Sequence, residues 1–200
     1  MNRYIYISVC FLTAALLAIF FTMDLSGQKK KNFVGYETCM PCHGQATLGN
    51  QIGVWRSSPH ARAYRILSTS EAKIIADKAG VGKPQEDAAC LSCHNTAAGK
   101  YDSVKGEGVG CEACHGPAGN WYEYENHVSL TNRSAGYRKA VSLGMYPIIG
   151  IDSIKFREKM CRRCHTAERP CVPEEVTDRK QLKMPLEFIS DFIFKHPVRR

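Results

Sequence analysis

Four copies of one cysteine–histidine pattern constrain this 200-residue chain more than any other feature of its sequence. Each copy reads C-x-x-C-H, whereas the composition predicts roughly 0.02 copies by chance. Two thiols three positions apart can each bond to one vinyl group of the same haem, and the histidine that follows can bind the iron through its neutral imidazole. The sequence therefore predicts four covalently bound haem c groups. We call the copies hooks 1 to 4: Cys39, Cys42 and His43; Cys90, Cys93 and His94; Cys111, Cys114 and His115; and Cys161, Cys164 and His165.

Two other chemistries use paired cysteines. Four C-x-x-C hooks could form two tetrahedral zinc sites, but zinc does not require a histidine after every second cysteine. Disulfides within C-x-x-C are strained and more often redox-active than structural. Thioether attachment explains all three residues of each hook, so haem is the favoured interpretation.

The N-terminal residues predict export. Arg3 precedes an uncharged run from Tyr4 to Met23, and twenty helical residues at about 1.5 Å each span about 30 Å, the thickness of a bilayer core. Residues 1–27 are therefore either a cleaved signal peptide or a membrane anchor, and Cys10 is an apolar core residue of that segment. Residues 28–35 form a linker and residues 36–200 the tetrahaem cytochrome c domain. We expect this domain in the periplasm or on the outer face of the cytoplasmic membrane, where haem is attached to such hooks.

The formal net charge of +8 raises the question of nucleic acid or anionic membranes as partners. Four haems bring roughly eight propionate carboxylates, which need nearby cations or water. Much of the positive charge can therefore compensate the cofactor. The chain lacks a nucleic-acid recognition motif, and we expect no nucleic acid partner.

The expected fold is mainly α, with short helices and long loops wrapped around a four-haem core and negligible β structure. Helices are predicted over about 59–67, capped by Ser58, and over 71–79, ended by Gly80. A third should run from Ser153 into hook 4. Five glycines around hook 3 indicate close backbone turns there. The short gap between hooks 2 and 3 predicts that their haems lie close together.

Three histidines lie outside the hooks: His60, His127 and His196. Four irons each need a sixth ligand or remain open, so these three histidines are the candidate distal iron ligands. The sequence does not say which iron each serves. One iron is left over, which could be five-coordinate, take a ligand from a neighbouring chain, or take a methionine: Met145, Met160 or Met184.

Three stretches, Gly35–His43, Trp55–Ala63 and Gly108–Ala118, resemble the cytochrome c-554 family of tetrahaem cytochromes. The resemblance implies a mainly helical protein with closely packed haems that moves electrons, in the best-known members away from hydroxylamine oxidoreductase. It also implies three haems with two histidine ligands and one haem open on its distal side, here that of hook 2. The long N-terminal segment and the additional Cys171 depart from the family pattern and leave the physiological partner open.

Electron transfer between redox partner proteins is the favoured function, because four adjacent haems make a conducting row and nothing marks a dedicated catalytic haem. An electron carrier is therefore expected rather than an enzyme. One alternative is a small nitrogen-oxide reductase at the open haem; others are a membrane-anchored quinol-oxidising cytochrome and a multihaem conduit subunit. Cys171, between two prolines, suggests a disulfide-linked homodimer.

Overall fold

The computed structural model describes residues 32–150 and 153–166, and this part of the chain is built from helices, turns and loops without a β-strand. The prediction of a mainly α fold with short helices is confirmed. Within the described residues, no helix has the length and apolar character needed to cross a membrane. The predicted signal or anchor segment, Cys171 and His196 lie outside the described residues.

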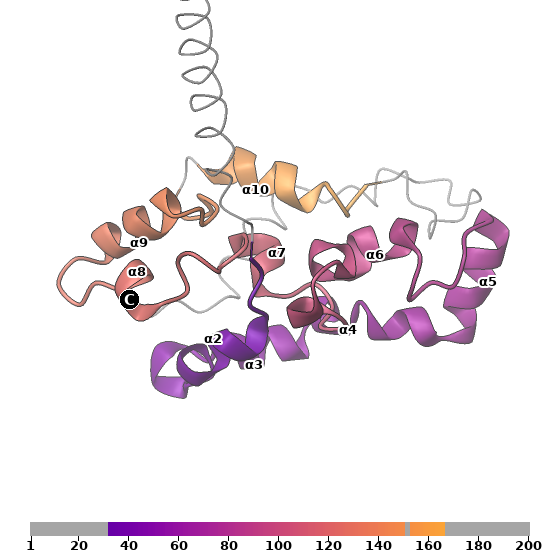
Figure 1. Ribbon diagram of the computed structural model, residues 1–200, viewed down its shortest axis with the longest axis horizontal. Helices are drawn as coiled ribbons and strands as arrows, with labels where there is room; N and C mark the ends of the chain where they lie inside the picture. The colour runs from indigo at the N-terminus through magenta and orange to yellow at the C-terminus, as the bar shows by residue number, and fades with distance from the viewer. Residues whose placement is uncertain (1–31, 151–152, 167–200) are drawn as a thin grey trace, which may run out of the picture. The chain divides into compact units, whose positions relative to one another are not determined.

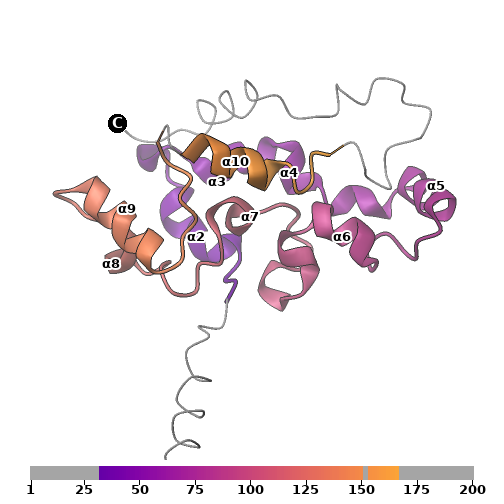
Figure 2. The same ribbon diagram turned by 90° about the horizontal axis from the view of Figure 1, so that it is seen from above.

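Hook 3 lies on a short central helix in both ribbon views, with α8 and α9 to one side of it and α6 to the other (Figure 1, Figure 2). The α-helices are α2 (Tyr36–His43), α3 (Gln51–Ser57), α4 (Pro59–Arg62), α5 (Ser70–Ala79), α6 (Ala88–His94), α7 (Cys111–His115), α8 (Tyr124–His127), α9 (Arg133–Ser142) and α10 (Ile154–Cys161). Between them lie the 3₁₀ segments η2 (Ala46–Leu48), η3 (Arg65–Ser68), η4 (Thr96–Gly99) and η5 (Asp102–Val104).

Helix α5 follows the sequence prediction closely. The Thr69 hydroxyl accepts a hydrogen bond from the backbone N–H of Ala72 at 3.2 Å, so Thr69 caps the N-terminus. Gly80 ends the helix in the left-handed region, with φ of 64°. Glycine is favoured at such a position because it has no Cβ to clash with the following carbonyl.

The single helix predicted over 59–67 is wrong, because the chain forms α4 and then the separate segment η3. Tertiary hydrogen bonds explain the interruption. The His60 carbonyl accepts from the N–H of Val109 at 2.9 Å, and the Ala63 carbonyl accepts from the His94 ring at 2.8 Å. Ser58 stands at the N-cap position, but its hydroxyl donates to the Trp55 carbonyl instead of capping α4.

Two glycines beside hook 3 make the close turns that the sequence predicts. Gly108 has φ of 81°, and a Cβ there would lie 2.5 Å from the His60 carbonyl oxygen. Gly116 has φ of 83°, and its Cβ would lie 2.8 Å from the Tyr146 ring. A side chain at Gly108 would therefore displace the segment that carries His60.

A buried carboxylate ties the first described residues to hook 3. Glu112 is 2% exposed and accepts backbone hydrogen bonds from Val34 at 3.0 Å, Gly35 at 2.8 Å and Ala118 at 2.6 Å. Burial raises the pKa of its carboxyl group, and the three N–H donors partly oppose that rise. The C-terminal end of the predicted linker is thus held against the haem-binding part of the chain.

The side-chain core of the described residues is small. Its main cluster holds Ala118, Trp121, Ala140 and Met145, and two of these four side chains are single methyl groups. The burial of Met145 in this cluster places it as a packing residue, the ordinary role of methionine. Fully burying one large apolar side chain contributes only about 1.5–3 kcal/mol, so a core of this size supplies modest stability.

We predict that Glu112→Ala destabilises the holoprotein by about 3 kcal/mol, because three backbone N–H groups lose their acceptor in a buried place. Urea unfolding followed by circular dichroism measures this change. The matched control is Glu86→Ala, which breaks only an exposed ion pair to Lys83 and should change stability by less than about 1 kcal/mol. Equal effects of the two substitutions would contradict a structural role for Glu112.

Candidate haem-binding site

Hooks 1 to 3 each occupy the last turn of a short helix. Helix α2 ends at His43, α6 at His94 and α7 at His115. Residues at positions i, i+3 and i+4 of an α-helix lie on one face. The two sulfurs and the imidazole of each hook therefore face the same way, as attachment to one flat ligand requires.

Hook 4 reaches the same arrangement by a turn. Helix α10 ends at Cys161, and the backbone N–H groups of Cys164 and His165 both donate to the Cys161 carbonyl, at 3.2 and 2.9 Å. Met160, one of the alternative iron ligands, lies in this helix immediately before the hook and is partly buried.

Two observations on the described residues bear on the two alternative chemistries. No disulfide joins two hook cysteines within this part of the chain. Within residues 32–150 and 153–166, no three His, Cys, Asp or Glu side chains come together as a metal site. A tetrahedral zinc site needs four such ligands around one ion.

Hydrogen bonds at Nδ1 orient two of the candidate iron-binding imidazoles. His94 Nδ1 lies 2.8 Å from the Ala63 carbonyl oxygen, and His127 Nδ1 lies 2.9 Å from that of Glu123. A carbonyl oxygen can only accept, so Nδ1 carries the proton and Nε2 keeps its lone pair for a metal. Burial also lowers the pKa of His60, which favours the neutral, metal-binding form of that ring.

Four histidines lie in two pairs. The ring centroids of His43 and His127 are 6.4 Å apart with an interplanar angle of 26°, and those of His60 and His165 are 6.0 Å apart at 75°. Metal–imidazole bonds are about 2 Å long, so two imidazoles on opposite sides of one ion have centroids about 6 Å apart once the ring radii are added. Both pairs have the spacing of two axial ligands on one iron.

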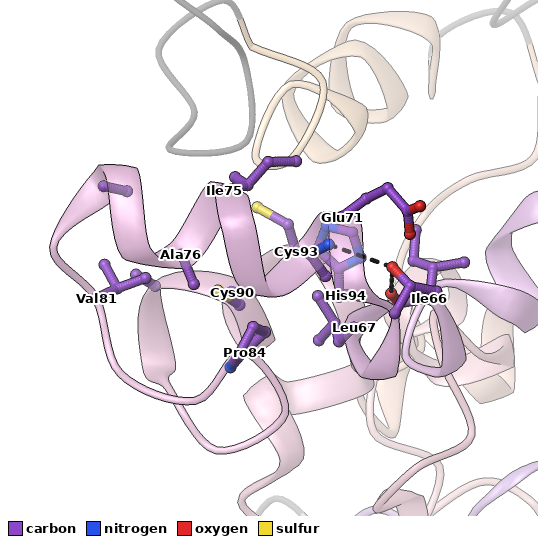
Figure 3. A pocket seen from close by; sticks show the side chains of 14 residues that line it. Ile66, Leu67, Glu71, Ile75, Ala76, Val81, Pro84, Cys90, Cys93 and His94 are labelled. Atoms are coloured by element: carbon purple, nitrogen blue, oxygen red, sulfur yellow. Dashed lines mark hydrogen bonds between the residues drawn. The ribbon is translucent and has the colours of Figure 1, made fainter.

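Hook 2 borders an apolar pocket between α5 and α6. Figure 3 shows Ile75 and Ala76 of α5 facing Cys90, Cys93 and His94 across it. The remaining lining is mostly aliphatic: Ile66, Leu67, Thr69, Glu71, Ala72, Ala79, Val81, Pro84 and Ala89. An apolar wall opposite two thiols and an oriented imidazole suits one face of a macrocycle. Among the described residues, His94 is the one histidine that lines this pocket.

These residues fit haem c. Each hook directs two sulfurs and an imidazole to one side, two hooks meet a second imidazole at the axial spacing, and a third borders an apolar pocket.

Comparisons with known proteins agree with this donor set. Residues 38–116 match the family model described as cytochrome c554 and c-prime. Cytochrome c-554 of Nitrosomonas europaea is 32% identical over 125 residues, which cover 56% of this chain and 49% of the relative. Residues 38–116 are therefore similar to the cytochrome c-554 family. This similarity supports covalently bound haem c as the cofactor.

The comparisons cover only part of this chain and part of the relative. The chain spans about half the length of this relative, and no solved structure matches the chain. The family match includes hooks 1 to 3 and His60 but ends before His127 and hook 4. The C-x-x-C-H pattern and the histidine pairs support the assignment of those residues instead.

Some residues that build the site carry no signal in the sequence. The carbonyl groups of Ala63 and Glu123 fix two imidazoles, and any residue type supplies a carbonyl. The i, i+3, i+4, i+7 spacing of Ala72, Ile75, Ala76 and Ala79 indicates an apolar face on α5, but not what that face meets.

The two pairs predict two different low-spin signals in electron paramagnetic resonance of the oxidised holoprotein. The angle between two axial imidazole planes sets the splitting of the iron d orbitals, and here the angles are 26° and 75°. His127→Ala should remove the signal of the near-parallel pair, and His60→Ala that of the near-perpendicular pair. Loss of the same signal in both variants would contradict the pairing.

Proposed function

We propose that this chain is an exported tetrahaem c-type cytochrome that transfers electrons between redox partner proteins. Haem c supplies one-electron iron chemistry when bound. The observation that carries the proposal is the closeness of hooks from distant parts of the sequence. Such neighbours favour a conducting row over four separate centres.

Three contacts between pairs of hooks support a conducting row of haems. A hydrogen bond to Cys111 raises the pKa of Cys39, which supports a position of hook 1 beside hook 3. Burial, and to a lesser degree the Cys161 and Cys111 sulfurs, raise the pKa of Cys114 to about 12, so hook 3 also neighbours hook 4.

The third contact links hook 4 to hook 2. Cys93 Sγ lies 3.9 Å from the Arg163 carbonyl oxygen, and Cys164 Sγ lies 3.8 Å from that of Ser92. We therefore propose the order hook 1, hook 3, hook 4, hook 2. Close contact between the haems of hooks 2 and 3 stays a prediction.

The histidine pairs support a ligand assignment. We assign His127 to the iron of His43 and His60 to the iron of His165, from their ring separations. His196, which lies outside the described residues, is left for hook 3. Hook 2 then carries the open iron, in agreement with the family resemblance and with the pocket lining. The open iron thus lies at one end of the proposed row.

A small nitrogen-oxide reductase at hook 2 is the second candidate, favoured by a pocket that no second histidine of the described residues lines. Such a reaction needs protons. Glu71 lines the pocket, but hydrogen bonds from its own backbone N–H and from Thr69 and Ser70 lower the pKa of its carboxyl group. A carboxylate that stays ionised near neutral pH is a poor proton donor, which weighs against catalysis.

The remaining sequence predictions complete the proposal. We propose export by residues 1–27, as a cleaved signal or as an anchor, because haem attachment to such hooks takes place outside the cytoplasmic membrane. A membrane anchor would favour the quinol-oxidising alternative. Iron ligands donated from one chain to another would favour the conduit subunit. Dimerisation through Cys171 also stays a prediction.

Carbon monoxide distinguishes carrier from reductase. The reduced holoprotein should bind about one carbon monoxide per four haems, because three irons have two histidine ligands. His127→Ala should raise this ratio to about two. In stopped-flow mixing with an oxidised acceptor protein, the carbon monoxide complex should still deliver about three of its four electrons.

The reductase alternative predicts a different result. The holoprotein would then turn over nitric oxide or hydroxylamine in steady state, and carbon monoxide would abolish that turnover. Steady-state turnover sensitive to carbon monoxide would therefore contradict the assignment as an electron carrier.

A further inference from the structure

Arg157 has a buried guanidinium group that the described part of the chain does not neutralise. The residue is 8% exposed, and its Nε has no hydrogen-bond partner among the described residues. Its single hydrogen bond among the described residues runs from one terminal nitrogen to the Gly150 carbonyl oxygen at 3.5 Å, which is long for this type of bond. Both ion pairs within residues 32–150 and 153–166 involve other cations, Lys83 and Arg162.

Burial of an unpaired guanidinium is costly. Arginine is almost never fully buried without a partner, because the loss of hydration is large and the group does not give up its proton. The other cations of this segment do not carry this cost, since Lys155, Lys159, Arg162 and Arg163 are exposed. The environment of Arg157 therefore requires an anion.

The position of Arg157 indicates which anion. Arg157 and Cys161 are four positions apart in α10 and so lie on the same face of that helix. Burial raises the pKa of the Cys161 thiol, and the Arg157 guanidinium is close enough to oppose part of that rise. Arg157 thus faces the side of α10 from which hook 4 is presented.

We propose that Arg157 is a positioning residue that binds a haem propionate carboxylate packed against α10. The inference rests on the proposed binding of haem by the hooks. A propionate is a carboxylate, and a planar guanidinium binds carboxylates with two parallel hydrogen bonds. The contact would satisfy the free Nε of Arg157 and neutralise both charges.

The contact has a consequence for the redox properties of that haem. Oxidised iron carries one more positive charge than reduced iron, so a nearby guanidinium disfavours oxidation and raises the midpoint potential. The guanidinium also keeps the propionate ionised near neutral pH. Removing it should lower the potential of one haem, and that potential should rise as the pH falls and the released carboxylate takes up a proton.

The test compares Arg157→Gln, Arg157→Lys and Lys155→Gln with wild-type holoprotein in spectropotentiometric titrations over a range of pH. Lys155 is the matched control, because it is a cation of the same helix that lies outside hook 4 and is exposed to solvent. We expect Arg157→Gln to lower one of four midpoint potentials and to make it pH-dependent. Arg157→Lys keeps the charge and should lower that potential less, and Lys155→Gln should leave all four unchanged.

Haem is counted first by pyridine haemochrome, so that a failure of haem binding can be distinguished from a failure of the propionate contact. Wild-type protein without covalent haem would refute the proposed function itself. Four unchanged potentials in a fully loaded Arg157→Gln protein would overturn the propionate contact alone. If Arg157→Gln does not fold, Arg157→Lys decides together with redox-difference infrared spectra. A propionate carboxylate band identical to that of the wild type would then overturn the contact.

Discussion

The pairing of two imidazoles across one iron is the interaction on which the proposed structure depends. His43 lies at the end of α2 and His127 at the end of α8, and their rings are 6.4 Å apart. His60 lies in α4 and His165 just beyond α10, and their rings are 6.0 Å apart. Each pair joins segments far apart in the chain whose own helices are only a few turns long. Because the side-chain core is small, we expect coordination to replace much of the packing that larger domains use, and cofactor binding to be part of the folding free energy.

Polar groups of the chain support this arrangement. The Ala63 carbonyl accepts a hydrogen bond from the His94 ring, and the Glu123 carbonyl accepts one from the His127 ring as well as one from the backbone N–H of Asn126. Glu112 holds the first described residues against hook 3 through three backbone N–H groups. Two backbone carbonyls and one buried carboxylate thus fix two imidazoles and one chain segment.

The sequence predicts the chemistry of the site better than its geometry. The spacing within each hook already implies one face of one helical turn, and α5 with its end at Gly80 agrees with the structure. The interruption after α4 could not be foreseen, because it depends on hydrogen bonds from Val109 and His94, which are distant in sequence. Pairing of the histidines is likewise a tertiary property, since spacing along the chain does not say which rings meet. The buried state of Arg157 also carries no local signal, because α10 contains several cations and only the packing distinguishes one of them.

The central claim is that four hooks each hold one haem by two thioether bonds. Intact-mass spectrometry of the purified, exported protein tests it most directly, followed by proteolysis and mass analysis of each hook peptide. The account predicts the mass of the chain, with or without its N-terminal segment, plus four haems, and one haem on each of the four peptides. Unmodified cysteines in any hook, or a chain that carries zinc in place of haem, would contradict it.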